Sequence, residues 1–284
     1  MSKNRSRATA IAAITGLSLL LAGCSPEMQR GFLPDASGVT NHTDRIIGLW
    51  TTSWIVLLAV GVVSWGLMAW ALIVYRRRKG ETGLPAQMRY NMPIETLFTV
   101  VPLILVLGFF AFTARDMTAI EAKTENPDVF IEVIGKQWSW DFNYVDDNVY
   151  DSGIQAQVVG NQDNVLETLP TLYLPVGKTV RIDLSSRDVI HSFWVVEFLY
   201  KKDMFPGHTN SMYFTPLQEG TYVGKCAELC GEYHSMMLFN VKVVSQTEYD
   251  AQMSTLAAQG NVGQLSTEYD RNQNLPGGDP GIRG

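Results

Sequence analysis

The feature that most constrains this chain is a run of thirty residues without a charged side chain, residues 46–75 of 284. About 20 consecutive apolar residues are enough to cross a bilayer as a helix. Trp50, Trp54 and Tyr75 lie toward the ends of the run, where interfacial aromatic residues are enriched. Basic residues follow at once over 76–79, and such a cluster marks the cytoplasmic side of a span. The run therefore predicts a transmembrane helix over 46–75.

A second apolar run predicts a helix over 94–114 that crosses back, and Pro102 within it is a point where the helix can bend. Hydrophobic residues make up 46% of the chain and charged residues 18%, which is typical of a membrane protein with a soluble part. The net charge of −6 argues against nucleic acid as a partner. We expect a two-helix hairpin with a cytoplasmic loop over 76–93 and both termini of the mature chain outside.

The first residues have the pattern of a bacterial export signal. A basic start is followed by an apolar stretch over 8–20, which is too short to span a membrane. The stretch ends in Leu-Ala-Gly-Cys, which resembles a lipobox, in which Cys24 becomes the lipidated first residue after cleavage. The alternative is an uncleaved anchor with an incidental cysteine. We expect a signal peptide over 1–23, a lipid anchor at Cys24 and an extracytoplasmic linker over 24–45.

Residues 128–244 consist of short runs rich in β-branched and aromatic residues, separated by Gly, Pro, Asn and Asp. This pattern predicts an antiparallel sandwich or Greek-key barrel, as an extracytoplasmic domain over 115–245. The C-terminal tail over 246–284 is predicted to hold a short helix over 247–259. The last residues, 272–284, have a composition typical of disorder.

The segment CAELCGEYHSMM, residues 226–237, combines sulfur and imidazole in the side chains of Cys226, Cys230, His234 and Met237. A disulfide is possible in an exported domain but needs neither the histidine nor the methionine. Zinc suits two cysteines and two histidines, but methionine is a poor zinc ligand. Thiolate, imidazole and thioether together are the ligands expected for copper, and two cysteines can bridge two copper ions. Strand-like flanks place the segment in a loop between two strands.

A copper site of this kind needs a second histidine, for which the sequence offers His42, His191 and His208. His191 opens a strand-like run thirty-five residues before Cys226. In a sandwich, the end of one strand can meet the loop that joins two others. We therefore favour His191, although a single histidine is more often structural or at the surface.

The run His-Ser-Phe-Trp at 191–194, taken with 226–237, resembles the dinuclear copper (CuA) signature of subunit 2 of cytochrome c oxidase. The resemblance extends over 46–244 and implies a two-helix transmembrane hairpin plus an all-β cupredoxin-like Greek-key barrel. It also implies the metal ligands. One copper would bind His191 and Met237, the other would bind His234 and the backbone carbonyl of Glu228, and Cys226 and Cys230 would bridge both.

The resemblance implies the electron-entry subunit of a proton-pumping, bacterial aa3-type cytochrome c oxidase. Electrons from cytochrome c would pass through the copper pair to haem and the oxygen-reducing haem-copper site, with haem held by subunit 1 only. The implied partners are subunits 1 and 3, membrane lipids, and cytochrome c or the haem domain of a cytochrome bc complex. The implied location is the bacterial inner membrane, as a multi-pass protein with both termini extracytoplasmic.

Further roles follow from the resemblance. Trp138, in the segment QWSWDFNY, would be the point of electron entry; the alternative is a place in the sandwich core. The Glu228 carboxylate would bind a magnesium ion shared with subunit 1. Glu95 would lie at the mouth of a proton path, although an acid at a helix N-terminus is favourable in itself. Acidic residues would attract a basic cytochrome, the alternative being a solvated acidic loop. These docking residues would be Asp146, Asp147, Asp151, Asp188 and Asp203.

Other protein classes fit the residues less well. A quinol oxidase subunit 2 lacks the two copper-site cysteines, and nitrous oxide reductase lacks such a membrane hairpin. A membrane-anchored copper chaperone with a Cys-x3-Cys pair remains as the alternative function. Such a chaperone would have a thioredoxin-like α/β fold, which the strand-rich pattern and Met237 oppose.

Overall fold

The computed structural model describes residues 25–269, except 81, 85–86 and 157–167, and residues 282–283. The predicted signal peptide, Cys24 and nearly all of the predicted disordered end lie outside the described residues. The chain forms two compact units. The first comprises Met1–Asp35 and Trp50–Glu81, and the second comprises Ala36–Leu49 and Thr82–Gly284.

Two long helices are the candidate membrane spans among the described residues, α3 (Thr43–Val74) and α4 (Met92–Ile120). Both are long and apolar enough to cross a membrane, which confirms the predicted pair of apolar helices. α4 begins after Asn91, whose side chain accepts a hydrogen bond from the Ile94 N–H at 3.3 Å. A short helix, α2 (Pro26–Gln29), precedes α3 in the first unit.

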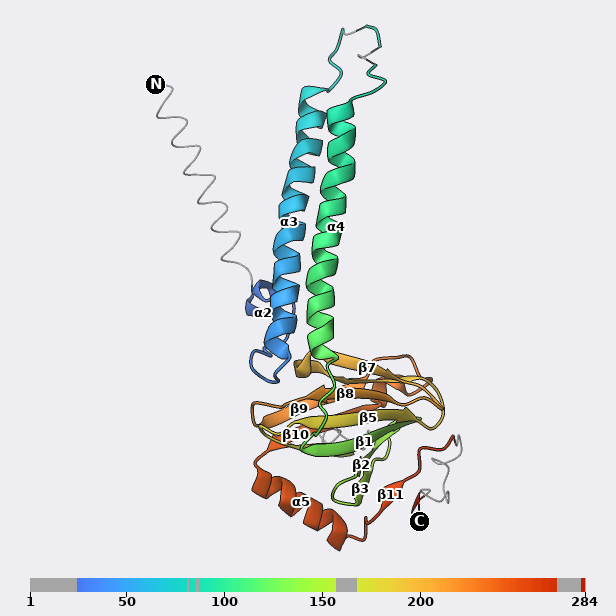
Figure 1. The fold of residues 1–284 in the computed structure, drawn as a ribbon. Coiled ribbons are helices and arrows are strands. Elements are labelled where there is room, and N and C mark those ends of the chain that lie inside the picture. The colour runs from blue at the N-terminus through green and yellow to red at the C-terminus, as the bar shows by residue number, and fades with distance from the viewer. Residues whose placement is uncertain (1–24, 81, 85–86, 157–167, 270–281, 284) are drawn as a thin grey trace. The chain divides into compact units, whose positions relative to one another are not determined.

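The second unit contains a β-sandwich whose two sheets lie face to face (Figure 1). One five-stranded sheet has the order β3-β2-β1-β5-β8, and the other has the order β4-β10-β9-β6-β7. The strands of the first sheet are β1 (Val129–Lys136), β2 (Ser139–Tyr144), β3 (Val149–Ser152), β5 (Val180–Ser186) and β8 (Asn210–Phe214). Those of the second are β4 (Thr171–Pro175), β6 (His191–Val195), β7 (Tyr200–Met204), β9 (Gly220–Cys226) and β10 (Leu238–Val244). A single turn of 3-10 helix, η2 (Val196–Phe198), follows β6.

The sheets are mixed rather than wholly antiparallel. β1 pairs with β5 in parallel, as β10 does with β4, while the other pairs within these sheets are antiparallel. A parallel pair needs a long crossover connection, which the intervening strands supply here. The expectation of an antiparallel sandwich is therefore wrong for these two pairs, whereas the all-β class is confirmed.

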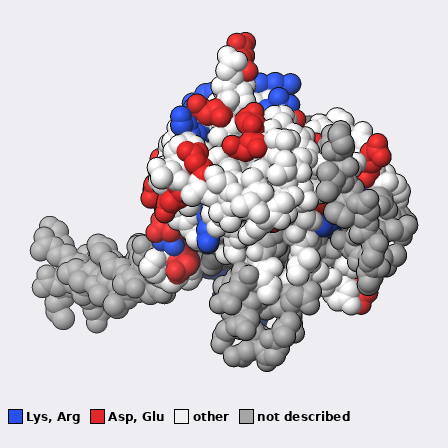
Figure 2. Space-filling model, turned by 90° about the horizontal axis from the view of Figure 1, so that it is seen from below, with Lys and Arg blue, Asp and Glu red and all other residues white. Residues whose placement is uncertain are grey.

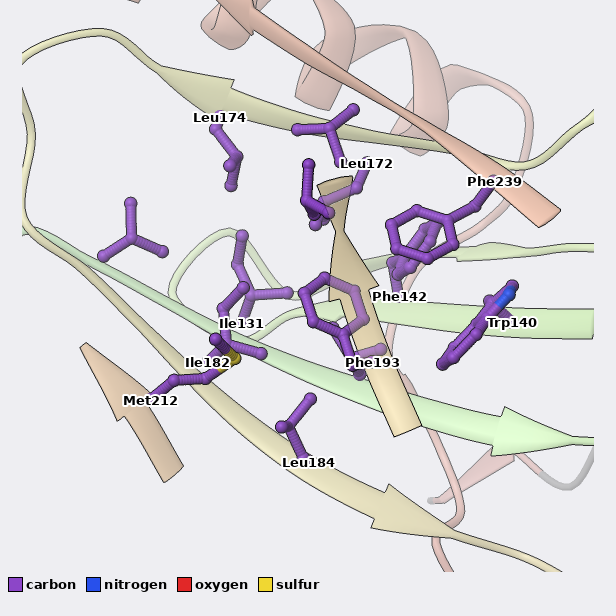
Figure 3. Packing of buried hydrophobic residues seen from close by; sticks show 14 of the residues in the cluster. Ile131, Trp140, Phe142, Leu172, Leu174, Ile182, Leu184, Phe193, Met212 and Phe239 are labelled. Atoms are coloured by element: carbon purple, nitrogen blue, oxygen red, sulfur yellow. The ribbon is translucent and has the colours of Figure 1, made fainter. Parts of the chain in front are cut away.

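Large side chains from both sheets fill the space between them (Figure 3). The rings of Phe193 and Phe239 stack at 4.9 Å, and Trp140 lies 4.9 Å from Phe239, centroid to centroid. Gly224 makes room for this cluster, because a Cβ at that position would lie 2.1 Å from the Phe239 ring. Each buried aromatic side chain stabilises the fold by about 1.5–3 kcal/mol, so this cluster contributes strongly to the stability of the sandwich.

Regular secondary structure continues along the chain after residue 245. Helix α5 (Gln246–Ala258) begins with a capping box between Ser245 and Glu248 and buries Tyr249, among other side chains. The chain then forms β11 (Gln264–Leu265), which pairs with β12 (Ile282–Arg283) in a separate two-stranded sheet. The helix predicted over 247–259 is thus confirmed.

Candidate metal centre

Residues 226–237, which we call the metal loop, form the connection between β9 and β10, as predicted. β9 ends at Cys226 and β10 begins directly after Met237, with one turn of 3-10 helix, η3 (His234–Met236), between them. The Cys226 N–H donates to the Met237 carbonyl at 3.0 Å and closes the base of the loop. His191 is the first residue of β6, which pairs with β9 so that Phe193 lies opposite Cys226. Sheet pairing therefore brings His191 beside the loop.

All six predicted ligand positions meet at this loop. The Sγ atoms of Cys226 and Cys230 are 3.8 Å apart, so they form no disulfide, which has a sulfur–sulfur distance of about 2.05 Å. The other distances are Cys226 Sγ to His191 Nδ1 3.8 Å, Cys226 Sγ to the Glu228 carbonyl oxygen 3.2 Å, Cys230 Sγ to His234 Nδ1 3.4 Å and Cys230 Sγ to Met237 Sδ 3.7 Å.

These distances suit ligands that share metal ions. In zinc sites a sulfur ligand lies about 2.3 Å and a nitrogen ligand about 2.0–2.1 Å from the metal, so two donors of one ion are at most about 4.6 Å apart. The pairs above fall within that limit. His191 and Met237 are fully buried, and the two thiols are almost so. Buried thiolate, imidazole and thioether donors fit copper better than zinc or a hard cation.

The two thiols share one hydrogen bond, which lowers the pKa of one thiol and raises that of the other. Interaction with Cys230 lowers the pKa of the Cys226 thiol to about 3, against the opposing effect of burial and with help from His191. The same interaction, followed by burial, raises the pKa of Cys230. Burial acts to lower the pKa of His191, but hydrogen bonds to Asp188 and Cys226 outweigh it and raise that pKa. A thiolate is therefore available to bind a metal ion at neutral pH.

Asp188 orients His191. Its Oδ1 is 2.7 Å from His191 Nε2, which leaves Nδ1 directed to Cys226. The same carboxylate accepts backbone N–H bonds from Gln137 at 2.6 Å and Val189 at 2.7 Å. Asp188 is only 5% exposed, so little of its carboxylate faces solvent, and its predicted docking role stays a prediction.

Trp138 lies against the metal loop, in the turn between β1 and β2. Its Nε1 donates to the Cys230 carbonyl at 3.2 Å, and Gln137 Nε2 donates to the same oxygen at 2.7 Å. The indole is half-buried and packs edge-on against the ring of Tyr233 at 4.9 Å. The neighbouring Trp140 is fully buried in the core, so the two tryptophans have different surroundings.

The remaining acidic candidates are spread over the domain. Asp146 and Asp147 are exposed in the turn after β2, at the end of that strand remote from Trp138. With about 3.3 Å per residue, they lie roughly 20 Å from the metal loop. They line a hollow with Asp128 and Asp250, and Figure 2 shows acidic side chains gathered on the face seen from below. Asp203 lies on β7 opposite Ser192, at the end of the sheet that carries His191.

Asp151 is partly buried in β3, where burial, and then the charge of Asp141, raises its pKa. Glu228 is exposed, while its backbone carbonyl turns to Cys226. Glu95 lies in the first turn of α4, where its Oε1 accepts the Asn91 N–H at 3.0 Å. The predicted magnesium ligand, Glu228, is thus exposed at the metal loop, and the predicted proton-path residue, Glu95, lies at the start of α4.

The other two histidines have surroundings of their own. His42 is buried with its Nε2 2.8 Å from the Tyr213 carbonyl oxygen, and His208 follows β7. One buried ionic group was missed: Asp141 is 2.7 Å from the Lys136 Nζ and is also paired with Arg187. No sequence signal marks this group, because Arg187 is distant along the chain and its partners are defined by sheet pairing.

Taken together, the fold and site define a class: a membrane protein whose cupredoxin-like β-sandwich carries a sulfur-rich metal loop. The chain is similar to members of one family over most of its length. The family "Cytochrome C oxidase subunit II, periplasmic domain" matches residues 129–244. A probable cytochrome c oxidase subunit 2 from Streptomyces avermitilis is 46% identical over 270 residues, covering 83% of this chain and 84% of that protein.

Cytochrome c oxidase subunit 2 from Mycobacterium tuberculosis is 34% identical over 295 residues, covering 86% of this chain and 80% of that protein. The solved periplasmic domain of subunit II of the Bradyrhizobium japonicum oxidase is 30% identical, with a TM-score of 0.44, and covers 48% of this chain and 99% of that chain. This protein belongs to the cytochrome c oxidase subunit II family, as the sequence resemblance predicted. It is a subunit of a cytochrome c oxidase, and the family implies a copper centre.

Proposed function

We propose that this chain accepts electrons from cytochrome c at a dinuclear CuA centre and delivers them to haem and the haem-copper site of subunit 1. The observation that carries the proposal is the pair of free thiols 3.8 Å apart, surrounded by two imidazoles, a thioether and a carbonyl oxygen. When bound, a copper pair bridged by two thiolates supplies one-electron transfer without breaking a substrate bond.

The residues of the chain divide this work. Cys226 and Cys230 would bridge, while His191, His234, Met237 and the Glu228 carbonyl complete the ligands. Strand pairing holds His191, and the closed loop base holds Cys226 and Met237. Burial of His191, Met237 and the two cysteines keeps water from these ligands, and a preorganised site resists movement, which favours rapid electron transfer.

The proposal extends to groups around the centre. Trp138, hydrogen-bonded to the Cys230 carbonyl, would be the electron entry point. The exposed Glu228 carboxylate would bind magnesium at the contact with subunit 1, and Glu95 would face a proton path in that subunit. Asp203 and the more distant Asp146, Asp147 and Asp151 would attract a basic cytochrome or the haem domain of a cytochrome bc complex. The enclosing complex would pump protons and contain subunit 3.

The proposed topology places 46–75 and 94–114 across the bacterial inner membrane and 76–93 in the cytoplasm. Residues 115–245 and the tail over 246–284 would be extracytoplasmic. A signal peptide over 1–23 would be removed, and a linker over 24–45 would start at lipidated Cys24. The chaperone alternative requires a thioredoxin-like α/β domain, whereas among the described residues the β-sandwich has no α-helix between paired strands.

Cys226→Ser tests the metal assignment in the purified complex. We expect loss of the dinuclear centre, because one thiolate cannot bridge two copper ions equally. The measurements are copper per chain and the electron spin resonance spectrum, in which a mixed-valence pair gives a multi-line signal. Ser235→Ala, at an exposed position of the same loop, is the matched control. A mixed-valence pair that survives Cys226→Ser would refute the proposal.

A further inference from the structure

An open groove lies in the first unit, where the segment after Cys24 packs on the start of α3 within that unit. Its volume is about 340 Å³ and its lining is mainly apolar. The lining residues are Met28, Arg30, Gly31 and Phe32 on one side and Trp50, Thr51, Trp54, Ile55 and Leu58 on the other. The metal centre uses none of them.

The wall of the groove depends on a glycine. Gly31 has a φ of +64°, and a Cβ there would lie 2.7 Å from Trp50 Nε1. The Trp50 Nε1–H donates to the Gly31 carbonyl at 3.2 Å, and the rings of Trp50 and Trp54 meet edge to face at 5.9 Å. The hydrogen bond therefore holds the backbone of the turn against the Trp50 indole, and the two together form one wall of the groove.

The groove follows the helix axis. Trp50, Trp54 and Leu58 are spaced four residues apart and so share one face of α3. With a rise of 1.5 Å per residue, they span about 12 Å, from the turn toward the middle of the helix. The side chains of Phe32 and Leu58 are 74% and 60% exposed. A narrow apolar surface along a membrane-spanning helix suits a hydrocarbon chain parallel to that helix.

Resting on the lipidation of Cys24 proposed above, we propose that this groove seats an acyl chain of that lipid anchor. Ser25, the next residue, caps α2 by accepting the Met28 N–H at 3.4 Å, and Met28 lines the groove. The attachment point is therefore adjacent in the chain to one wall. A glycerophospholipid would supply the anchor: its C–O bond to the headgroup phosphate breaks, a C–S bond forms to the thiol sulfur, and the thiol proton leaves with the phosphate.

Photo-crosslinking in the full-length chain tests the proposal in native membranes. A benzophenone amino acid replaces Leu58 inside the groove or, as the matched control, Val60, two residues on and roughly on the opposite face of α3. The same replacement of Ile55 gives an independent second reading within the groove. Irradiated protein is analysed by intact mass and by identification of linked peptides, with Cys24→Ser in parallel.

We expect an intramolecular link between the acylated Cys24 peptide and position 58 or 55, at least fivefold above that at position 60. In Cys24→Ser the link should be lost. An unacylated Cys24 overturns the proposal, as does equal linking at positions 58 and 60 or no link at any position. An adduct with the mass of a free phospholipid, equally abundant in Cys24→Ser, would show that the groove binds membrane lipid instead.

Discussion

Gly135 shows how a residue without a side chain can set the position of a proposed metal ligand, His191. It lies near the end of β1, opposite Trp140 of β2 and Ser186 of β5. A Cβ at this position would lie 2.8 Å from His191 Cδ2 and 3.1 Å from its Cγ. The imidazole therefore packs directly on the backbone of β1, and its position depends on the missing methyl group.

Gly135→Ala should displace His191 and destabilise the domain by about 1–3 kcal/mol, as overpacking of a buried site does. We also expect a changed visible absorption spectrum of the copper-loaded protein, because the His191 ring, a proposed copper ligand, moves. Gly220→Ala on β9 is the control, since its nearest neighbours lie 3.4 Å away on the Tyr222 ring. An unaltered spectrum and melting temperature in Gly135→Ala would contradict this account.

Asp151 is a partly buried carboxyl group whose pKa is raised, first by burial and then by Asp141. The folded state therefore holds this proton more tightly than the unfolded state, whose pKa is about 3.9. The free energy of unfolding therefore falls as the pH rises from about 3.9 through the raised pKa of the folded state, and it stays low at higher pH.

Asp151→Asn should remove the penalty and raise the melting temperature at pH 7, with a gain that shrinks toward pH 4. Melting curves of the purified chain over this pH range measure the effect, and Asp250→Asn at an exposed position is the control. A gain of equal size at every pH would mean that ionisation of Asp151 is not its cause.

At the scale of elements, β2 separates two groups that we expected to act together. Its first end carries Trp138 at the metal loop, and the turn after its last residue, Tyr144, carries Asp146 and Asp147. The roughly 20 Å between them exceeds twice the screening length of about 8 Å at physiological ionic strength. A docking site centred on Trp138 therefore feels the acidic pair only weakly.

Trp138→Ala should slow electron transfer from reduced cytochrome c at least tenfold, with nearly unchanged affinity, because an indole bonded to the Cys230 carbonyl is lost. Changing Asp146 and Asp147 together to Asn should alter association by less than about twofold at physiological salt and by more at low salt. Stopped-flow rates across a salt series measure both. A large loss of association at physiological salt in the double variant would place the docking site nearer the acidic turn.

At the scale of the whole molecule, the C-terminal segment completes the sandwich. The Asn143 side chain is fully buried and makes two hydrogen bonds to Leu265, donating to its carbonyl at 2.9 Å and accepting its N–H at 2.8 Å. Arg187 Nε donates to the Ser266 carbonyl at 2.6 Å. The buried polar side chains of Asn143 on β2 and Arg187 after β5 thus find hydrogen-bond partners in residues beyond α5.

Ending the chain at Gly260 should therefore reduce the free energy of unfolding by about 3–6 kcal/mol, since each buried group left without a partner costs about 1–3 kcal/mol. Ending it at Tyr269 keeps these contacts and serves as the control. Urea unfolding of both shortened chains gives the difference. Equal stability would show that water or neighbouring residues replace the segment.

Much of the architecture could be read from local sequence patterns. Long uncharged runs predicted both apolar helices, short β-branched and aromatic runs separated by turn residues predicted the strands, and a short helix was expected over 247–259. The metal loop was equally visible, because four potential ligands fall within twelve residues. Each of these signals concerns neighbours in the chain, where spacing alone determines which side chains can meet.

Tertiary structure decided the contacts that spacing cannot encode. Pairing of β6 with β9 brings His191 to the loop while His42 lies elsewhere, and the return of the chain after β5 places Asp188 beneath the imidazole instead of at the surface. The sequence by itself determined the kinds of element and the chemistry of the metal ligands, since these depend on composition and short-range spacing. Burial, strand register and the distance between Trp138 and the acidic turn depend on how the sheets pack, so only the folded chain defines them.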